Sequence, residues 1–261
     1  MSINSELPFL TTFRNGVKIV RFNRPEKKNS FSLEFYKTFS NILNEDAQDD
    51  DIKVTIITGI GDYFCSGTDL NFDAANIDIN NYLEENSSIF KRFVLAFINY
   101  PKLLIAVVNG PAIGVGVTIL ALCDIVYASE KATFQTPFLD LGLCPEACSS
   151  YLFPLILGSS KANEMLLLGY KMDAQEAYQF GLISKVIPHS KLNQFIEDLS
   201  KYGSIPIGSL KRSKGLIRRI PRGILSEVND AEVTVVKECI MSEEFYESLA
   251  RFLGRKNKSK L

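Results

Sequence analysis

Apolar and polar positions in the first half of the chain alternate between strand-like and helix-like spacings. Residues 17–22, VKIVRF, are apolar at every second position for most of their length and predict a strand. The runs VTIIT at 54–58 and LLIAVV at 103–108 are almost entirely apolar, which is typical of strands buried on both faces. Helical spacing predicts a helix over 32–45, with Ser32 as its cap, and another over 79–99. This order of strands and helices indicates an α/β core.

After residue 148 the pattern becomes mostly helical. The tetrad Asp173-Ala-Gln-Glu176 predicts a capping box at a helix start, and Gly181 marks the end of that helix. Residues 184–187 predict one last strand, and further helices are expected over 190–202, 206–220, 223–241 and 242–253. The sequence therefore predicts an α/β fold with a C-terminal helical segment.

Composition and charge argue against several classes of protein. The chain has 261 residues, of which 46% are hydrophobic and 23% are charged, as is typical of globular proteins. A formal net charge of -1 argues against a broad nucleic-acid-binding face. No apolar run reaches the roughly 18 residues that a membrane-spanning helix needs, and the first residues lack the pattern of a secretory signal.

The cysteines and the single histidine limit the chemistry further. Five scattered cysteines argue against a disulfide framework and for a reducing compartment. Only Cys144 and Cys148 are closely spaced, and His189 is far from them in the sequence, so no metal site is expected. His189 lies in the polar stretch IPHSK and is predicted to be a surface residue. Proton transfer would then fall to a carboxylate, a lysine or a tyrosine.

Two glycine-rich loops follow the two buried strands. Gly59-x-Gly61 and Gly114-x-Gly116 both lack the third glycine of a dinucleotide-binding fingerprint, and no P-loop motif occurs. The segments CSGTD at 65–69 and GVGV at 114–117 instead resemble loops whose backbone approaches a ligand closely. Two N–H groups that faced each other there would form an oxyanion hole, although ordinary turn formation explains either loop taken alone.

The tripeptide Ser259-Lys260-Leu261, SKL, ends the sequence. At a free carboxyl terminus this tripeptide is an address that the peroxisomal import receptor reads. The sequence therefore predicts a peroxisomal location, and the alternative is a basic tail that ends in this way by chance.

Together with their surroundings, the two loops resemble the crotonase (enoyl-CoA hydratase/isomerase) superfamily. The resemblance extends from about residue 10 to about residue 255. It implies a spiral core of ββα units over 1–190, a C-terminal helical trimerisation segment over 191–258 and the targeting tripeptide at 259–261. The segments that carry it are FNRPEKKNSFS at 22–32, YFCSGTDL at 63–70, PKLLIAVVNGPAIGVGVTILALCDIVYASEKATFQTPF at 101–138 and GYKMDAQEAYQFGLISKVI at 169–187.

The resemblance implies an acyl-CoA substrate whose thioester oxygen is held by the backbone N–H groups of Thr68 and Val115. Such donors stabilise the negative charge that forms on the oxygen when a proton leaves the neighbouring carbon. Arg24 and Lys27 are expected near the nucleotide part of CoA, unless they belong to a solvated charge run. No cofactor is expected, since coenzyme A is part of the substrate. The other substrate-binding positions implied are Lys28, Ser66, Gly67, Asp69, Leu70 and Gly114.

The positions of the carboxylates decide which reaction of the superfamily is expected. Similar hydratases use two carboxylates, and this sequence has Thr118 and Phe138 at those positions, which disfavours hydration. Glu146, in GLCPEACSS, lies where peroxisomal Δ3,Δ2-enoyl-CoA isomerases have their base. One glutamate would move a proton from C2 to C4 of a 3-enoyl-CoA, and an apolar pocket would raise its basicity. Ala147 departs from this subgroup, which usually has glycine there, and this bears on the acyl-chain preference.

Other acidic positions are given lesser roles. Asp69 and Asp124 match family positions and are expected to act as structural, capping or turn carboxylates, and Asp140 is expected at the surface. Without the resemblance, Glu146 would be explained as an acid stabilised near a helix N-terminus.

The resemblance thus implies an enoyl-CoA delta isomerase that serves β-oxidation of unsaturated fatty acids as a homotrimer. One alternative is a module of the same fold that binds acyl-CoA or a protein partner without catalysis, as in chromodomain-linked relatives. Another is a different reaction of the superfamily, such as thioester hydrolysis, which would release free CoA.

Overall fold

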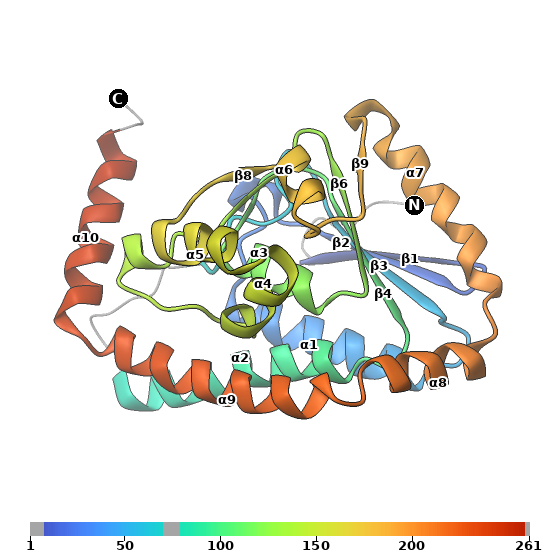
Figure 1. Cartoon of the computed structure of the whole chain (residues 1–261), viewed down its shortest axis with the longest axis horizontal. Helices are drawn as coiled ribbons and strands as arrows, with labels where there is room; N and C mark the ends of the chain where they lie inside the picture. Colours follow the sequence, from blue (N-terminus) through green and yellow to red (C-terminus); the bar gives the residue numbers. More distant parts are fainter. Residues whose placement is uncertain (1–7, 70–78, 259–261) are drawn as a thin grey trace.

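A six-stranded sheet lies at the centre of the computed structural model, which describes residues 8–69 and 79–258 of the chain (Figure 1). The strand order is β1-β2-β3-β4-β6-β9, in which β1 and β2 form an antiparallel hairpin and the other neighbours are parallel. The carboxyl ends of β2, β3 and β4 therefore meet at one edge. The strands are β1 (Phe9–Arg14), β2 (Val17–Phe22), β3 (Val54–Gly59), β4 (Leu103–Val108), β6 (Ile125–Ser129) and β9 (Lys185–Ile187).

A second, three-stranded sheet has the order β5-β7-β8. Its strands are β5 (Ala112–Ile113), β7 (Thr133–Gln135) and β8 (Met172–Asp173), with β5 parallel and β8 antiparallel to β7. An isolated parallel bridge between Cys65 and Ala112 joins the loop after β3 to β5. The small sheet thus ties together the two glycine-rich loops.

Three long helices, α1 (Leu33–Gln48), α2 (Ile79–Asn99) and α9 (Pro221–Ile240), pack in sequence along one side of the large sheet (Figure 1). Ser32 caps α1 as predicted, because its hydroxyl accepts the Phe35 N–H at 3.2 Å. Phe35 and Phe39 of α1 pack with Phe22 of β2 in an aromatic cluster beneath the sheet. Full burial of each such ring contributes roughly 1.5–3 kcal/mol.

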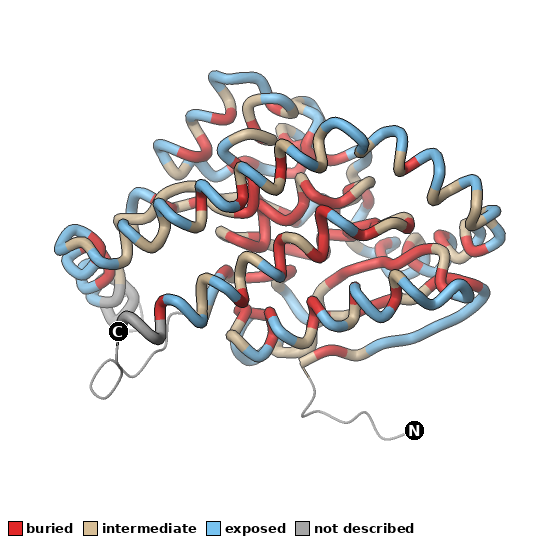
Figure 2. Tube along the Cα trace, turned by 90° about the horizontal axis from the view of Figure 1, so that it is seen from below, coloured by how far each residue is buried: buried red, intermediate tan, exposed pale blue. Residues whose placement is uncertain are grey.

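The remaining helices surround this core, and Figure 2 shows buried positions concentrated at the centre while the outer helices alternate between buried and exposed. The predicted capping box at Asp173 and Glu176 is present at the start of α6. No helix in the described ranges is both long enough and apolar enough to cross a membrane. The other α-helices are α3 (Val115–Thr118), α4 (Ser149–Leu157), α5 (Ser159–Leu168), α6 (Ala174–Gln179), α7 (Leu192–Asp198), α8 (Ile207–Ile217) and α10 (Glu243–Lys258).

Short 3-10 turns account for one difference from the predicted helix bounds. The helix expected over 190–202 is α-helical only in α7, because 3-10 turns flank it on both sides. The hairpin strand β1 was not predicted, since four of its six residues are exposed and give no apolar alternation. The 3-10 turns are η1 (Pro25–Lys27), η2 (Ile119–Leu122), η3 (Leu139–Leu141), η4 (His189–Lys191) and η5 (Leu199–Ser204).

Asp124 attaches α8, the first long helix of the C-terminal segment, to the sheet. Its carboxylate accepts hydrogen bonds from the Leu104 N–H at 2.8 Å and from the Lys214 ammonium at 2.6 Å. Arg218 also donates to it at 3.3 Å. Lys214 is buried, so its charge depends on this partner. Asp124 is thus a structural carboxylate, as the sequence predicted.

We expect Asp124→Ala to lower the free energy of unfolding by about 3–5 kcal/mol, because the buried Lys214 charge loses its partner. Denaturant titration measures this change. The matched control is Asp50→Ala, which removes an exposed carboxylate from Lys211 of the same helix. That surface pair should contribute at most about 1 kcal/mol. Equal effects of the two substitutions would contradict the assignment.

Candidate active site

The two glycine-rich loops lie against each other at the carboxyl edge of the sheet. The Ile113 N–H donates to the Cys65 carbonyl at 2.9 Å and joins the loops directly. Gly67 and Gly114 have φ values of +93° and +55°, in the left-handed region that favours glycine. A Cβ atom on Gly114 would lie only 3.8 Å from the Gly67 Cα atom. Glycine at both positions therefore lets the two backbones approach.

The N–H groups of Thr68 and Val115 follow these two glycines. Neither donates a hydrogen bond to an acceptor in the described part of the chain. Val115 is the first residue of α3, so its N–H precedes the helical bonding, whereas the Val117 and Thr118 N–H groups both bond to the Gly114 carbonyl. These two N–H groups come from neighbouring loops, as the two donors of an oxyanion hole would.

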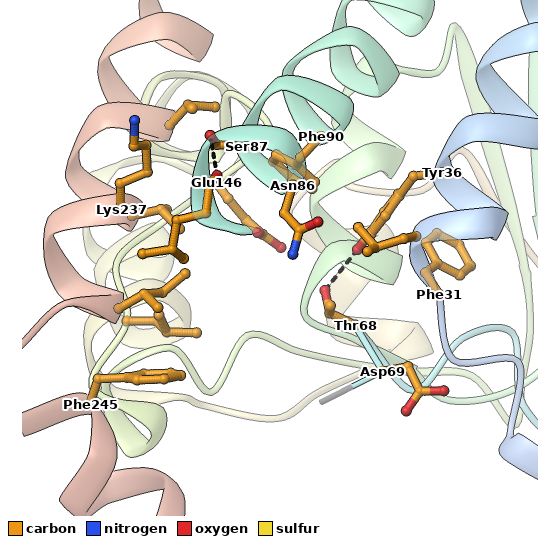
Figure 3. Close-up of a pocket in the computed structure, with 16 residues that line it drawn as sticks. Phe31, Tyr36, Thr68, Asp69, Asn86, Ser87, Phe90, Glu146, Lys237 and Phe245 are labelled. Atoms are coloured by element: carbon orange, nitrogen blue, oxygen red, sulfur yellow. Dashed lines mark hydrogen bonds between the residues drawn. The ribbon is translucent and has the colours of Figure 1, made fainter. Parts of the chain in front are cut away.

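Tyr36 of α1 fixes the side chain of Thr68. The Tyr36 hydroxyl and Thr68 Oγ1 are 2.7 Å apart and share a hydrogen bond (Figure 3). Burial raises the pKa of Tyr36 well above its ordinary value, with a smaller contribution from the Glu146 charge, so the phenol stays neutral. Sequence reasoning gave Tyr36 no role in the site and missed this contact.

A cavity of about 200 Å³ extends from Thr68 between α1, α2, α9 and α10 (Figure 3). Most of the side chains around it are apolar. Asn86 of α2 and Lys237 of α9 add polar groups to its wall. Such a cavity suits a ligand with a long hydrocarbon portion. The apolar lining residues are Phe31, Leu33, Leu83, Phe90, Leu143, Val233, Val236, Ile240 and Phe245.

Glu146 lies in the loop before α4, and its carboxylate points into this cavity (Figure 3). Burial raises the pKa of Glu146 to about 8, and the negative charge of Glu232 on α9 contributes to the shift. A carboxylate is a stronger base when the surrounding protein disfavours its ionised form. Glu146 can therefore accept a proton and release it again near neutral pH.

The backbone just after Glu146 is left-handed at two residues in succession. Ala147 has a φ of +53° and Cys148 a φ of +63°. A left-handed conformation costs a residue other than glycine about 1–2 kcal/mol. The glycine usual in the isomerase subgroup would adopt this conformation without that cost, and Ala147 adopts it all the same. The departure in sequence therefore leaves the left-handed turn in place.

The other predicted binding residues surround the first loop. The Ser66 N–H donates to the Lys28 carbonyl at 3.0 Å, and the Lys28 ammonium lies 4.9 Å from the centre of the Tyr63 ring. Asp69 borders the cavity but forms an ion pair with Arg24 at 3.2 Å, and its carboxylate points away from Glu146 (Figure 3). The Ser66 hydroxyl donates a hydrogen bond to the Lys27 carbonyl at 3.3 Å. Leu70 lies outside the described residues.

The positions of the hydratase carboxylates do not contribute to the cavity. Thr118 and Phe138 are both buried, and neither is among the residues that line it. His189 is half-buried and lies 2.9 Å from the Ser129 hydroxyl through Nδ1, in contact with the end of β6. Asp140 is exposed. Of the described carboxylate side chains, Glu146 and Asp69 are the two that line the cavity.

The raised pKa of Glu146 makes stability depend on pH in a defined direction. The folded protein holds the proton up to about pH 8, whereas the ordinary pKa is 4.5. The free energy of unfolding therefore falls as the pH rises between these values, because the folded protein keeps a proton that the unfolded chain has already released. We expect Glu146→Gln, which cannot ionise, to gain stability relative to the wild type from pH 5 to pH 8. Denaturant titrations at both pH values measure this gain, and a constant difference would contradict the pKa shift.

Comparisons with known proteins agree with this geometry. Residues 12–259 match the family described as enoyl-CoA hydratase/isomerase. The chain is 43% identical over 95% of its length to Enoyl-CoA delta isomerase 2 of Rattus norvegicus, of which it spans 64%. It is 42% identical over 97% of its length to Enoyl-CoA delta isomerase 3, peroxisomal, of Mus musculus, of which it spans 80%.

Among solved structures, the fold matches an enoyl-CoA hydratase/isomerase from Pseudoalteromonas atlantica T6c with a TM-score of 0.86. That protein is 33% identical, and the match covers 95% of this chain and 98% of that one. The predicted α/β class and crotonase-type core are thereby confirmed. On the match over residues 12–259 and these identities, the chain belongs to the enoyl-CoA hydratase/isomerase family.

Proposed function

We propose that this protein is a Δ3,Δ2-enoyl-CoA isomerase that converts 3-enoyl-CoA into 2-trans-enoyl-CoA. The observation that carries the proposal is the half-buried carboxylate of Glu146 in a mostly apolar cavity that Thr68 of the first glycine loop also lines. Two relatives named as enoyl-CoA delta isomerases, at 42–43% identity, support the same reaction.

The reaction would proceed as a 1,3-proton shift. The ionised Glu146 removes a proton from C2, and the electron pair of that C–H bond moves into a dienolate whose charge rests on the thioester oxygen. The Thr68 and Val115 N–H groups donate to that oxygen. The protonated Glu146 then delivers the proton to C4, and the double bond moves from C3=C4 to C2=C3. Loss of one such N–H donor costs about 2.7–4 kcal/mol of barrier in comparable sites.

Hydration would need a second acid–base group to hold and split a water molecule. The two positions at which hydratases of this superfamily have carboxylates are Thr118 and Phe138, whose side chains cannot transfer a proton at neutral pH. Asp69 is engaged by Arg24 and directed away from Glu146. These facts favour isomerisation over hydration.

The substrate would bind with its acyl chain in the apolar cavity and its CoA part near the first loop. Leu143, Val233 and Phe245 form part of the wall that an acyl chain would contact. Lys28 offers a positive charge for the CoA phosphates, as does Arg24 if it exchanges its pairing with Asp69. The proposed process is β-oxidation of unsaturated fatty acids, without a cofactor other than the CoA of the substrate.

A peroxisomal location and a homotrimer complete the proposal. The tripeptide SKL at 259–261 and the name of the mouse relative support the location, which fluorescence microscopy of a fusion protein with and without these residues can test. Exposed apolar side chains at Leu216, Ile217 and Ile220, each more than 70% accessible, support an interface between subunits. Analytical ultracentrifugation would measure the number of subunits.

We expect Glu146→Gln to lower kcat for 3-hexenoyl-CoA and 3-octenoyl-CoA by about 10²–10⁴-fold, because glutamine cannot accept the C2 proton. A spectrophotometric assay of 2-enoyl-CoA formation measures the rate. Asp140→Asn removes an exposed acid nearby and should keep the wild-type rate.

The pH profile gives this test a second readout. Because Glu146 acts in its ionised form, kcat/KM of the wild type should rise with pH through about 8. Full activity of Glu146→Gln would remove the proposed base. Binding of CoA without turnover by the wild type would favour a binding module, and release of free CoA would favour thioester hydrolysis.

A further inference from the structure

Glu232 of α9 contacts the turn that carries Glu146, although 84 residues separate it from Cys148. Its carboxylate accepts hydrogen bonds from the Cys148 N–H at 2.6 Å, the Ser150 N–H at 2.9 Å and the Ser150 hydroxyl at 2.5 Å. The side chain is 7% exposed. A buried carboxylate with three donors is a specific contact, because each donor offsets part of the cost of removing the charge from water.

The turn needs such an acceptor for two reasons. Ala147 and Cys148 are both left-handed, a conformation that is unfavourable for these residues and persists only when the surroundings enforce it. Cys148 also occupies the cap position before α4 and has no side-chain capping bond of its own. The first N–H groups of a helix lack helical partners, and here Glu232 accepts two of them from outside the helix.

Glu146 is held from the other side of the same turn. The Ser149 N–H and hydroxyl donate to the Glu146 carbonyl at 3.1 Å and 2.7 Å. Ser149 therefore fixes the carbonyl of Glu146, while Glu232 fixes the residues that follow. Rotation of the turn would carry the Glu146 carboxylate away from its place in the cavity.

We propose that Glu232 is a positioning residue, whose carboxylate holds the left-handed turn at Ala147 and Cys148 and so directs Glu146 into the cavity. The proposal rests on the proposed function, because it takes Glu146 to be the base. Whether Glu232 holds the turn can be measured without an assay of catalysis.

The charge of Glu232 has a second effect on Glu146. It raises the pKa of Glu146 in addition to burial, so its removal should lower that pKa. Other titratable groups interact with Glu146 or line the same cavity, and all of them remain in a Glu232 variant. They are Tyr36 of α1, Cys65 and Asp69 of the first loop, Cys144 of its own loop and Lys237 of α9.

The test is Glu232→Gln, which keeps the size of the side chain but removes its charge and turns one acceptor into a donor. We expect kcat to fall about tenfold to a hundredfold, as a misdirected base would cause, with a smaller change in KM. The acidic limb of the pH profile should move to lower pH. NMR titration of the ¹³C-labelled Glu146 carboxyl should give a lower pKa than in the wild type.

Two further variants separate positioning from a general structural defect. Glu227→Gln makes the same charge change at an exposed position of α9 and should leave kcat and the pH profile unchanged. Ala147→Gly in the Glu232→Gln background should recover part of kcat, because glycine adopts the left-handed conformation without the help of the hydrogen bonds to Glu232. If Glu232→Gln does not fold, Ala147→Gly is compared with the Ala147→Gly/Glu232→Gln protein instead.

Unchanged kcat and an unchanged Glu146 titration in the Glu232 variant would overturn the proposal. Rapid hydrogen exchange of the Cys148 and Ser150 amides in the wild type would overturn it as well, because Glu232 should protect both. Absence of isomerisation by the wild type would refute the proposed function alone, since the titration and the exchange measurements still decide whether Glu232 holds the turn.

Discussion

Enclosing one ionisable carboxyl group in an apolar cavity is the constraint on which the site depends. Burial opposes the ionised form of Glu146 and raises its pKa to about 8, which makes this carboxylate a stronger base than an ordinary one. This unfavourable placement persists because contacts outside the cavity fix the backbone around Glu146. Ser149 donates to its carbonyl, and Glu232 accepts hydrogen bonds from Cys148 and Ser150 further along the turn.

The C-terminal helices are part of this enclosure. α9 packs against α2 and contributes one wall of the cavity, and Phe245 at the start of α10 extends that wall. Asp124 anchors the preceding helix α8 through a buried ion pair with Lys214. The segment that the sequence predicts to be an oligomerisation segment thus encloses Glu146, since α9 carries both Glu232 and part of the apolar lining.

Local patterns predicted most of the fold, because buried strands such as LLIAVV and capped helices such as that after Ser32 carry their signal in adjacent residues. The exposed strand β1 lacks such a signal. Glu146 and the two loops could be assigned through the resemblance. Glu232 could not, because its partners are distant in the chain, although its spacing from Leu225 and Asn229 does put it on the buried face of α9. The hydroxyl contact of Tyr36 was missed for the same reason.

The N–H groups of Thr68 and Val115, which have no acceptor among the described residues, belong to the main chain, and this has a consequence for the evolution of the fold. Replacing a side chain leaves a backbone N–H group where it was. The capacity of these two groups to polarise a carbonyl would therefore be inherited together with the glycines that let the two loops approach each other. In the proposed reaction the acid that acts on the ligand is encoded separately, at Glu146, while this chain has Thr118 and Phe138 at the two hydratase positions. Natural selection can therefore exchange one reaction for another on this fold by moving a carboxylate, while the two main-chain donors stay in place.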